Sequence, residues 1–285
     1  MIATIKKLFW VSRPVSWPNT AYPFAAGYLV LGGQVDLALI LGTLFFLFPY
    51  NLMMYGVNDV FDYESDILNP RKGGVEGMKE EKAFHPAIMK AVAIVNVPFI
   101  IYFLSIGSAG AKIVFAGLVF FVLAYSLKYL RFKEIPLLDS ITSSIHFVGP
   151  LVFALALLGF PGGAWPFVAA FFLWGMASHA FGAVQDIIPD RKGGLHSVAT
   201  VIGARATVCG AMILYLAAAI LVGQVGGWSL LVAAAGLLYI ANIWPYRSVT
   251  DEASGSTNKA WKRFIRLNYF VGFVVTIALI LHAIT

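Results

Sequence analysis

Long uninterrupted apolar runs, separated by short polar stretches, dominate the pattern of this chain. Because the runs are continuously apolar and do not alternate with polar residues, they favour transmembrane helices over a transmembrane β-barrel. Runs of roughly 17 to 25 apolar residues are long enough to cross a bilayer as helices. They predict nine helices, near residues 16–33, 36–56, 86–107, 110–127, 138–159, 164–185, 203–223, 228–245 and 265–284.

The composition supports this interpretation. Hydrophobic residues make up 60% of the 285 residues and charged residues only 12%, and the mean hydropathy is +0.82. A soluble domain of this length cannot hide so much apolar surface, so we expect an all-α integral membrane protein with nine transmembrane helices. No linker rich in Pro, Gly or Ser divides the chain, so residues 1–285 form a single predicted domain. The one cysteine, Cys209, excludes an intramolecular disulfide.

The charged residues indicate how the helices are oriented. With nine helices, nineteen of the twenty Lys and Arg residues fall on one side of the membrane, and only Lys112 falls on the other. The positive-inside rule makes this side cytoplasmic, so we predict a cytoplasmic N-terminus, an outside C-terminus and a location in the cell membrane. The net charge of +6 is therefore a sign of topology and does not indicate a nucleic-acid partner. Every acidic residue except Asp36 lies on the same side, which places the predicted function at the cytoplasmic face.

Two acidic clusters follow directly after even-numbered predicted helices. They consist of Asn58, Asp59, Asp62 and Asp66 in the first cluster, and Asp186 and Asp190 in the second. Within each cluster, residues spaced four apart share one face of a helix. Both clusters lead into a basic and glycine-rich stretch, at residues 70–74 and 191–194. Two such modules could hold one ligand from both sides; the alternative is a coincidence between short loops.

Clustered carboxylates repel one another and raise one another's pKa unless a cation lies between them. The sequence therefore predicts Mg²⁺ sites that serve a phosphorylated substrate, because Mg²⁺ binds through one or two carboxylates plus phosphate oxygens. The alternative is a solvated acidic helix cap, which would favour a helix N-terminus rather than the end of an apolar run. The predicted metal ligands are Asn58, Asp62, Asp66, Asp186 and Asp190, and the predicted catalytic residues are these four aspartates and Asp59.

Basic, amide and aromatic residues near the acidic clusters are the predicted substrate-binding groups. Arg and Lys bind diphosphate oxygens, although the positive-inside rule already accounts for basic residues on this side. For the amide side chains, the alternative role is to form hydrogen bonds between helices. A Tyr at this position can stabilise a carbocation or belong to the aromatic belt at the membrane interface. The predicted substrate-binding set is Asn51, Asn58, Arg71, Lys72, Tyr125, Lys128, Arg131, Gln185, Arg191 and Lys192.

These motifs resemble a known family. Asn-Asp-x-x-Asp-x-x-x-Asp at 58–66, Asp-x-x-x-Asp at 186–190 and nine helices are similar to the UbiA superfamily of intramembrane prenyltransferases, and residues 125–131 resemble that family's basic motif. Segments 12–17, 49–51, 54–66, 69–77, 172–178 and 267–272 resemble, more closely, the lycopene elongases of bacterial fifty-carbon carotenoid pathways. Pro189 departs from the pattern, because proline disfavours a helical residue before it. Asp186 and Asp190 therefore either share a helical face or straddle a helix end.

The resemblance implies a reaction. A dimethylallyl group would pass from dimethylallyl diphosphate to the ends of lycopene with Mg²⁺ as cofactor, in a UbiA-like bundle whose cavity opens at the cytoplasmic face. Attack of the terminal double bond of lycopene on the allylic cation would leave a tertiary cation on the acceptor, which would then lose a proton or capture water. Membrane lipid and carotenoid-pathway proteins are the other implied partners.

Two alternatives stay open at this point. One is a prenyltransferase acting on a quinone, haem or chlorophyll precursor, although no predicted helix centre carries a Lys or Arg to anchor a charged acceptor. The other is a cation-coupled membrane transporter, whose carboxylates should lie near the bilayer midplane rather than at one face.

Overall fold

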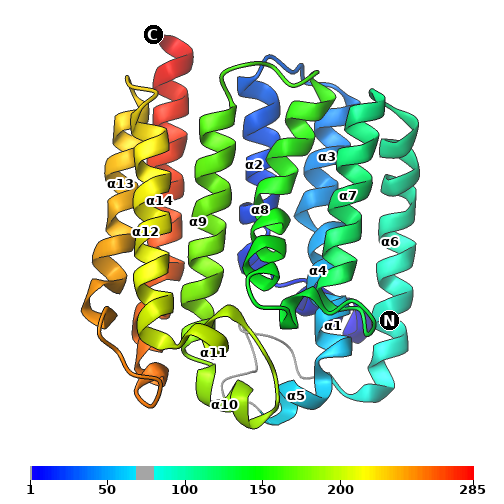
Figure 1. Cartoon of the computed structure of the whole chain (residues 1–285). Helices are drawn as coiled ribbons and strands as arrows, with labels where there is room; N and C mark the ends of the chain where they lie inside the picture. Colours follow the sequence, from blue (N-terminus) through cyan, green and yellow to red (C-terminus); the bar gives the residue numbers. More distant parts are fainter. Residues whose placement is uncertain (1, 69–79) are drawn as a thin grey trace. The chain divides into compact units, whose positions relative to one another are not determined.

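The computed structural model describes residues 2–68 and 80–285, and every regular element within these ranges is a helix (Figure 1). Eight helical spans in this part of the chain are long and apolar enough to cross a membrane. The protein is therefore a multi-pass membrane protein, and the predicted all-α class is confirmed. Arg71 and Lys72 lie outside the described residues.

The chain divides into two compact units, and the first comprises Met1–Phe132 and Ile145–Pro161. Its helices are α1 (Ile2–Val11), α2 (Pro18–Val30), α3 (Leu37–Leu47), α4 (Pro49–Phe61), α5 (Tyr63–Leu68), α6 (His85–Ser105), α7 (Ala109–Ser126) and the later turns of α8 (Leu138–Leu157). Aromatic side chains form the centre of its core. Phe45, Phe103, Phe115 and Phe153 are fully buried, and the rings of Phe115 and Phe153 are 4.8 Å apart.

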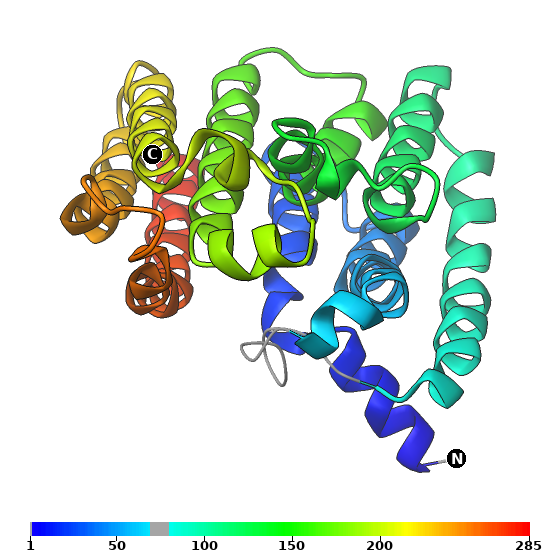
Figure 2. The same ribbon diagram turned by 60° about the horizontal axis from the view of Figure 1, so that its bottom comes forward.

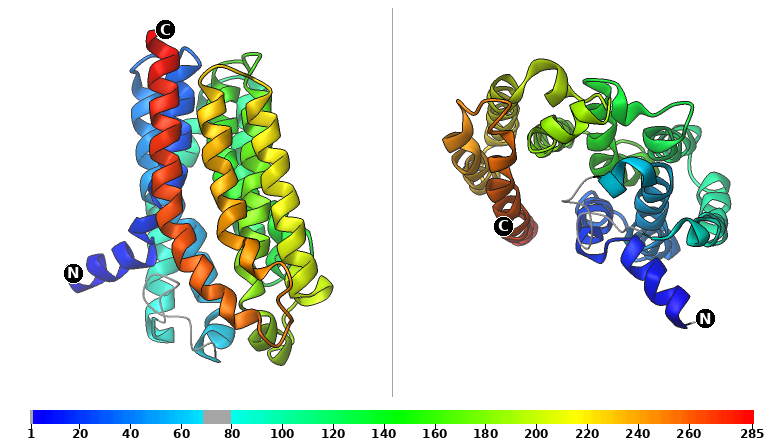
Figure 3. Two further views of the ribbon diagram at one scale, coloured as in Figure 1. Left: turned by 90° about the vertical axis from the view of Figure 1, so that its left-hand side faces the viewer. Right: turned by 90° about the horizontal axis from the view of Figure 1, so that it is seen from below.

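The second unit comprises Lys133–Ser144 and Gly162–Thr285. It holds the first turns of α8 together with α9 (Trp165–Val184), α10 (Ile187–Lys192), α11 (Val198–Ile202), α12 (Ala204–Gly223), α13 (Ser229–Ile243) and α14 (Asn258–Ile284). Helix α12 packs against both α9 and α13, and α13 packs against α14 (Figure 3). The short helices α10 and α11 lie at the end of the unit where α9 finishes (Figure 2).

The segment predicted as one helix at 36–56 is broken into α3 and α4 at Phe48. Pro49 explains the break, since it has no N–H and is tolerated only in the first turn of the helix that it begins. The break disturbs backbone carbonyls that must be satisfied inside the protein. The buried Asn51 side chain supplies the donor: its Nδ2 lies 2.8 Å from the carbonyl oxygen of Phe46 and 3.1 Å from that of Leu47.

The N-terminal region differs from the prediction. The predicted segment 16–33 is an α-helix only over Pro18–Val30, and thirteen residues span about 20 Å, less than the roughly 30 Å of a hydrocarbon core. For this reason the predicted count of nine membrane helices is not confirmed. Helix α1 was not predicted; it extends away from the other helices of its unit (Figure 3) and exposes Ile5, Phe9 and Trp10. Apolar and basic residues on one short helix are typical of a helix lying at a membrane interface.

Gly175 allows α9 to approach the first turns of α8 closely. A Cβ atom at this position would lie 3.0 Å from the backbone Cα of Ser144. The two helices are also joined by a hydrogen bond of 2.6 Å from Ser144 Oγ to the carbonyl oxygen of Phe172. Any side chain at 175 would therefore push the two helices apart.

We expect Gly175→Ala to lower the free energy of unfolding by about 2 kcal/mol, because the added methyl group overpacks this contact. The matched control is Gly210→Ala in α12, where nothing lies within 4 Å of the added atom. Thermal unfolding in detergent micelles measures both variants. Equal midpoints for the two would show that the α8–α9 contact adjusts without strain.

Candidate active site

The first acidic cluster lies where α4 ends. Asp62 occupies the C-cap position of α4, and its buried carboxylate accepts a hydrogen bond of 2.6 Å from Asn58 Nδ2. Asn58 Nδ2 also lies 3.1 Å from the hydroxyl of Ser126, the last residue of α7. Arg131 Nη2 is 3.6 Å from Asp62 Oδ1, while its Nη1 donates to the carbonyl of Phe61. The first unit thus brings together three residues that the sequence assigned to metal and diphosphate binding.

Asp59 has a partner that the sequence did not indicate. Its Oδ1 lies 2.6 Å from Arg13 Nη2, and both side chains are largely buried. The guanidinium of Arg13 also lies over the ring of Tyr55, 4.2 Å from its centre, in a cation–π contact. Arg13 has a left-handed backbone, with φ of 50°. No local spacing could have revealed this pair, because its members are 46 residues apart.

The second acidic cluster joins α9 to α10. Asp186 is the N-cap residue of α10 and Asp190 lies inside that helix, with a 2.9 Å hydrogen bond from the Asp190 backbone N–H to the Asp186 carbonyl. A helix boundary therefore lies at Asp186, as Pro189 suggested. Gln185, which caps α9, is buried and accepts a 2.6 Å hydrogen bond from Asn258 Nδ2 at the start of α14.

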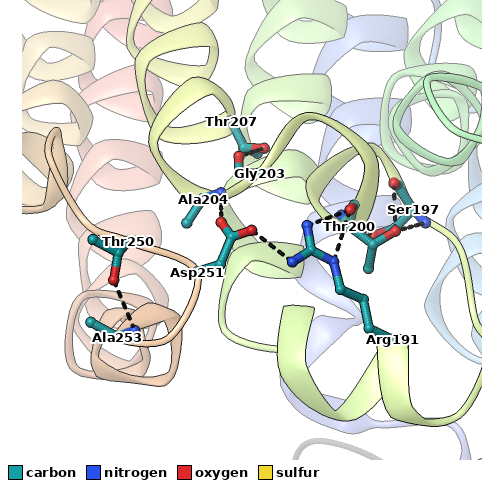
Figure 4. A network of polar contacts seen from close by, with 9 residues as sticks. All are labelled: Arg191, Ser197, Thr200, Gly203, Ala204, Thr207, Thr250, Asp251 and Ala253. Atoms are coloured by element: carbon teal, nitrogen blue, oxygen red, sulfur yellow. Dashed lines mark hydrogen bonds and ion pairs between the residues drawn. The ribbon is translucent and has the colours of Figure 1, made fainter.

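Arg191 connects α10 to the elements that follow it (Figure 4). Its Nε and Nη2 donate to the carbonyl oxygen of Thr200 at 3.0 and 2.6 Å, and its Nη1 lies 2.7 Å from Asp251 Oδ2. The other oxygen of Asp251 accepts the backbone N–H of Ala204, the first residue of α12. The hydrogen bond from Ala204, and then that from Arg191, hold the pKa of Asp251 below its ordinary value of 3.8.

The remaining predicted residues are placed as follows. Lys128 is exposed, with its Nζ 6.0 Å from the centre of the Tyr129 ring, and Lys192 is also exposed. The ring of Tyr125 meets that of His146 edge-on at 5.0 Å. Asp66 belongs to α5, but its side chain is not described. The roles assigned to all of these residues stay predictions.

The donor chemistry around the two clusters suits Mg²⁺. Within residues 2–68 and 80–285 there is no group of three or more His, Cys, Asp or Glu residues close enough to enclose a metal ion. Mg²⁺ does not need such a cage, because it keeps several waters and uses one or two carboxylates together with substrate phosphates. Asn58 and Asp62 offer amide and carboxylate oxygen atoms, which are ligands of this kind. The residues present therefore fit this cation.

A model of the UbiA prenyltransferase family matches residues 20–280 of this chain. The chain belongs to the UbiA prenyltransferase family. The predicted family resemblance is confirmed, and this UbiA protein is a prenyltransferase. The alternative of a cation-coupled transporter loses its support.

Curated relatives narrow the comparison within the UbiA family. The chain is 45% identical over 282 residues to the lycopene elongase/hydratase of Corynebacterium glutamicum, covering 98% of each protein. It is 51% identical over 272 residues to the C(50) beta-cyclic carotenoids biosynthesis protein LbtBC of Dietzia sp. (strain CQ4). That alignment covers 94% of this chain but 63% of the Dietzia protein, so the chain spans less than two thirds of that relative.

Solved structures confirm the UbiA fold. A UbiA homolog from Archaeoglobus fulgidus bound to DMAPP and Mg²⁺ gives a TM-score of 0.71 at 19% identity, covering 93% of this chain and 98% of that chain. The apo structure of a UbiA homolog from Aeropyrum pernix K1 gives a TM-score of 0.68 at 19% identity, covering 94% and 98%.

We expect Arg13→Met to lower the free energy of unfolding by about 3 kcal/mol, because it removes the 2.6 Å ion pair that Arg13 makes with the buried Asp59 carboxylate. Adding Asp59→Asn removes that charge, so the double variant should recover much of the loss. Chemical or thermal unfolding of the two single variants and the double variant measures the coupling. Strictly additive effects would mean that the ion pair contributes nothing.

We expect Asp251→Asn to lower the unfolding midpoint at pH 7 by about 3 °C, the shift that roughly 1 kcal/mol produces in a chain of this size. A depressed pKa in the folded state means that the charged carboxylate stabilises the fold above its ordinary pKa of 3.8. This contribution is lost as the pH falls through the lowered pKa. The difference between wild type and variant should therefore shrink toward pH 3, and a constant difference from pH 7 to pH 3 would contradict the assignment.

Proposed function

We propose that this protein transfers a dimethylallyl group from dimethylallyl diphosphate to the ends of lycopene in carotenoid biosynthesis. The observation that carries the proposal is the near full-length similarity to a lycopene elongase/hydratase. A hydrocarbon acceptor is also favoured by the helix centres, none of which carries a Lys or Arg that could anchor a charged acceptor. We place the reaction at the cytoplasmic face of the cell membrane, with the N-terminus inside and the C-terminus outside, on the asymmetry of the basic residues.

Four of the five aspartates in the two acidic clusters, together with Asn58, have one role in this proposal. Asn58, Asp62 and Asp66 from the first cluster and Asp186 and Asp190 from the second hold Mg²⁺. When bound, Mg²⁺ neutralises the diphosphate as the carbon–oxygen bond breaks. Asp59, the fifth aspartate, forms a 2.6 Å ion pair with Arg13, which fixes the orientation of the last turn of α4. No covalent nucleophile is required, since ionisation of the allylic diphosphate supplies a carbocation that the polyene attacks.

Basic side chains take the charge of the departing diphosphate that the metal does not neutralise. Arg131 is the best placed in the first unit, because its guanidinium already lies 3.6 Å from Asp62. A planar guanidinium binds two diphosphate oxygens at once. The other members of this set are Arg71, Lys72, Lys128, Arg191 and Lys192.

Three polar residues support the site from the helices. Asn51 is buried in the first turn of α4 and Gln185 is buried next to the second cluster, and each holds a helix end in place through its amide. Tyr125 presents an aromatic ring that suits a carbocation. Carotenoid-pathway proteins and membrane lipid are the further partners that we propose.

The decisive experiment combines membranes containing the protein with lycopene, dimethylallyl diphosphate and Mg²⁺, and reads the carotenoids by mass. We expect products one and two five-carbon units longer than lycopene, and no products after Mg²⁺ is removed with a chelator. Asp62→Asn and Asp186→Asn should each lower the rate by about 10²-fold or more, because each removes a charge that holds the metal.

The double variant tests whether both clusters act on one diphosphate. Residues that act as a unit are strongly non-additive, so the double variant should be little slower than either single variant. The matched control is Glu252→Gln, which changes an exposed carboxylate and should keep full activity. Lycopene left at its original mass by the wild-type protein would refute the proposed acceptor, and full activity of either aspartate variant would refute the metal role.

A further inference from the structure

A buried carboxylate lies outside both acidic clusters. Asp139, in the first turn of α8, has no exposed surface. Its Oδ1 accepts the backbone N–H of Ser140 at 2.6 Å and the hydroxyl of Ser140 at 3.2 Å, while its Oδ2 accepts the backbone N–H of Val198 at 2.8 Å. A carboxylate taken out of water needs donors of this kind to remain charged. All of these groups belong to the second unit.

Ser140 links this carboxylate to a histidine. Its Oγ lies 3.2 Å from Nδ1 of His179, which is inside α9. A serine hydroxyl has one proton, and here Ser140 donates it to Asp139. His179 Nδ1 must then carry the proton of the second hydrogen bond, which makes Nε2 the basic nitrogen of the neutral ring. The arrangement is that of a base whose tautomer is set by a second group and, through it, by a carboxylate.

The packing of α8 against α9 holds these groups together. Gly175 contacts Ser144, and His179 contacts Ser140. His179 is four residues after Gly175 in α9, and Ser140 is four residues before Ser144 in α8, so the two contacts are about one helical turn apart. His179 is thus held at a fixed place on α9 by backbone approach and not by its own hydrogen bond alone.

His179 is also aligned with the second acidic cluster. It precedes Asp186 by seven residues, which is two helical turns or about 10 Å along the axis, and brings both residues to one face. Gln185 and Asp186 keep right-handed helical dihedral angles beyond the last residue of α9, so this alignment continues to Asp186. His179 therefore lies deeper in the apolar segment than the cluster. An ionisable residue inside a membrane helix, with named partners, is by default a candidate for function.

We propose that His179 is the base that ends the reaction, with Ser140 and Asp139 as positioning residues. This inference rests on the proposed function. The diphosphate stays at the polar end of α9, and the carbon end of the donor extends into the apolar segment. After the new carbon–carbon bond forms, the acceptor end is a tertiary cation. A C–H bond next to the cationic carbon breaks, its electron pair becomes a double bond, and its proton passes to His179 Nε2. The imidazolium that forms is stabilised by Asp139 through Ser140.

A structural role for the same residues must be separated from this chemistry. Asp139 fixes the start of α11 through Val198, and its loss would disturb the fold whether or not His179 takes a proton. The ratio of unsaturated to hydrated product ends separates the two roles. Damage to the fold reduces the amount of active enzyme but leaves this ratio unchanged. Loss of the base instead lets water add to the cation, so the share of hydrated ends rises.

The test uses His179→Asn in the membrane assay with lycopene, dimethylallyl diphosphate and Mg²⁺. Asparagine keeps a donor toward Ser140 but cannot take up a proton. We expect the ratio of hydrated to unsaturated ends to rise about fivefold or more, because positioned bases accelerate proton transfer by at least 10²-fold. Ser140→Ala should shift the ratio in the same direction by less. The matched control is His282→Asn, an exposed histidine near the end of α14, which should give the wild-type ratio.

The outcomes distinguish this inference from the proposed function. If the wild-type protein makes no elongated carotenoid, the proposed function is refuted, and the deprotonation step loses its substrate. Elongation by the wild type with an unchanged ratio in His179→Asn overturns only the role of His179. Wild-type products whose ends are all hydrated overturn it as well, since no carbon-bound proton is then removed.

Discussion

In a hydrocarbon environment, every backbone N–H and C=O must find its partner within the protein, and the rest of this structure depends on that constraint. It explains why the regular elements in the described part of the chain are all helices. It also explains what happens where a helix is interrupted. At the break before Pro49, the amide of Asn51 donates to the carbonyls of Phe46 and Leu47, and the hydroxyl of Thr20 also donates to the carbonyl of Phe46.

The same constraint places polar chemistry at helix ends. Asp62 caps α4, Asp186 begins α10, and Asp139 receives the N–H of the first residue of α11. At such positions the backbone itself offers donors and acceptors, so carboxylates and amides are already satisfied in part before any ligand arrives. Each cluster is therefore a part of the fold as well as a candidate site.

The sequence predicts the features that depend on local pattern. The membrane-length apolar runs correctly predict most of the long helices. The four-residue spacing of Asn58 and Asp62 correctly predicts that their side chains lie within hydrogen-bonding distance. Long-range pairs are different in kind. Arg13 and Asp59, or Asp139 and Val198, are brought together only when helices pack, and no spacing along the chain records the contact. Helix α1 escaped prediction because its ten residues, two of them lysines, are too few and too polar for a membrane span.

The close approach at Gly175 constrains how this part of the protein can change over generations. A Cβ at 175 would lie 3.0 Å from the backbone Cα of residue 144, so shrinking Ser144 to alanine or glycine removes part or all of the side-chain contact but leaves this backbone contact. A substitution at 144 therefore relieves only part of the overlap, and a larger residue at 175 also requires the helices to shift. Glycine is therefore the residue at 175 that keeps the present spacing of α8 and α9.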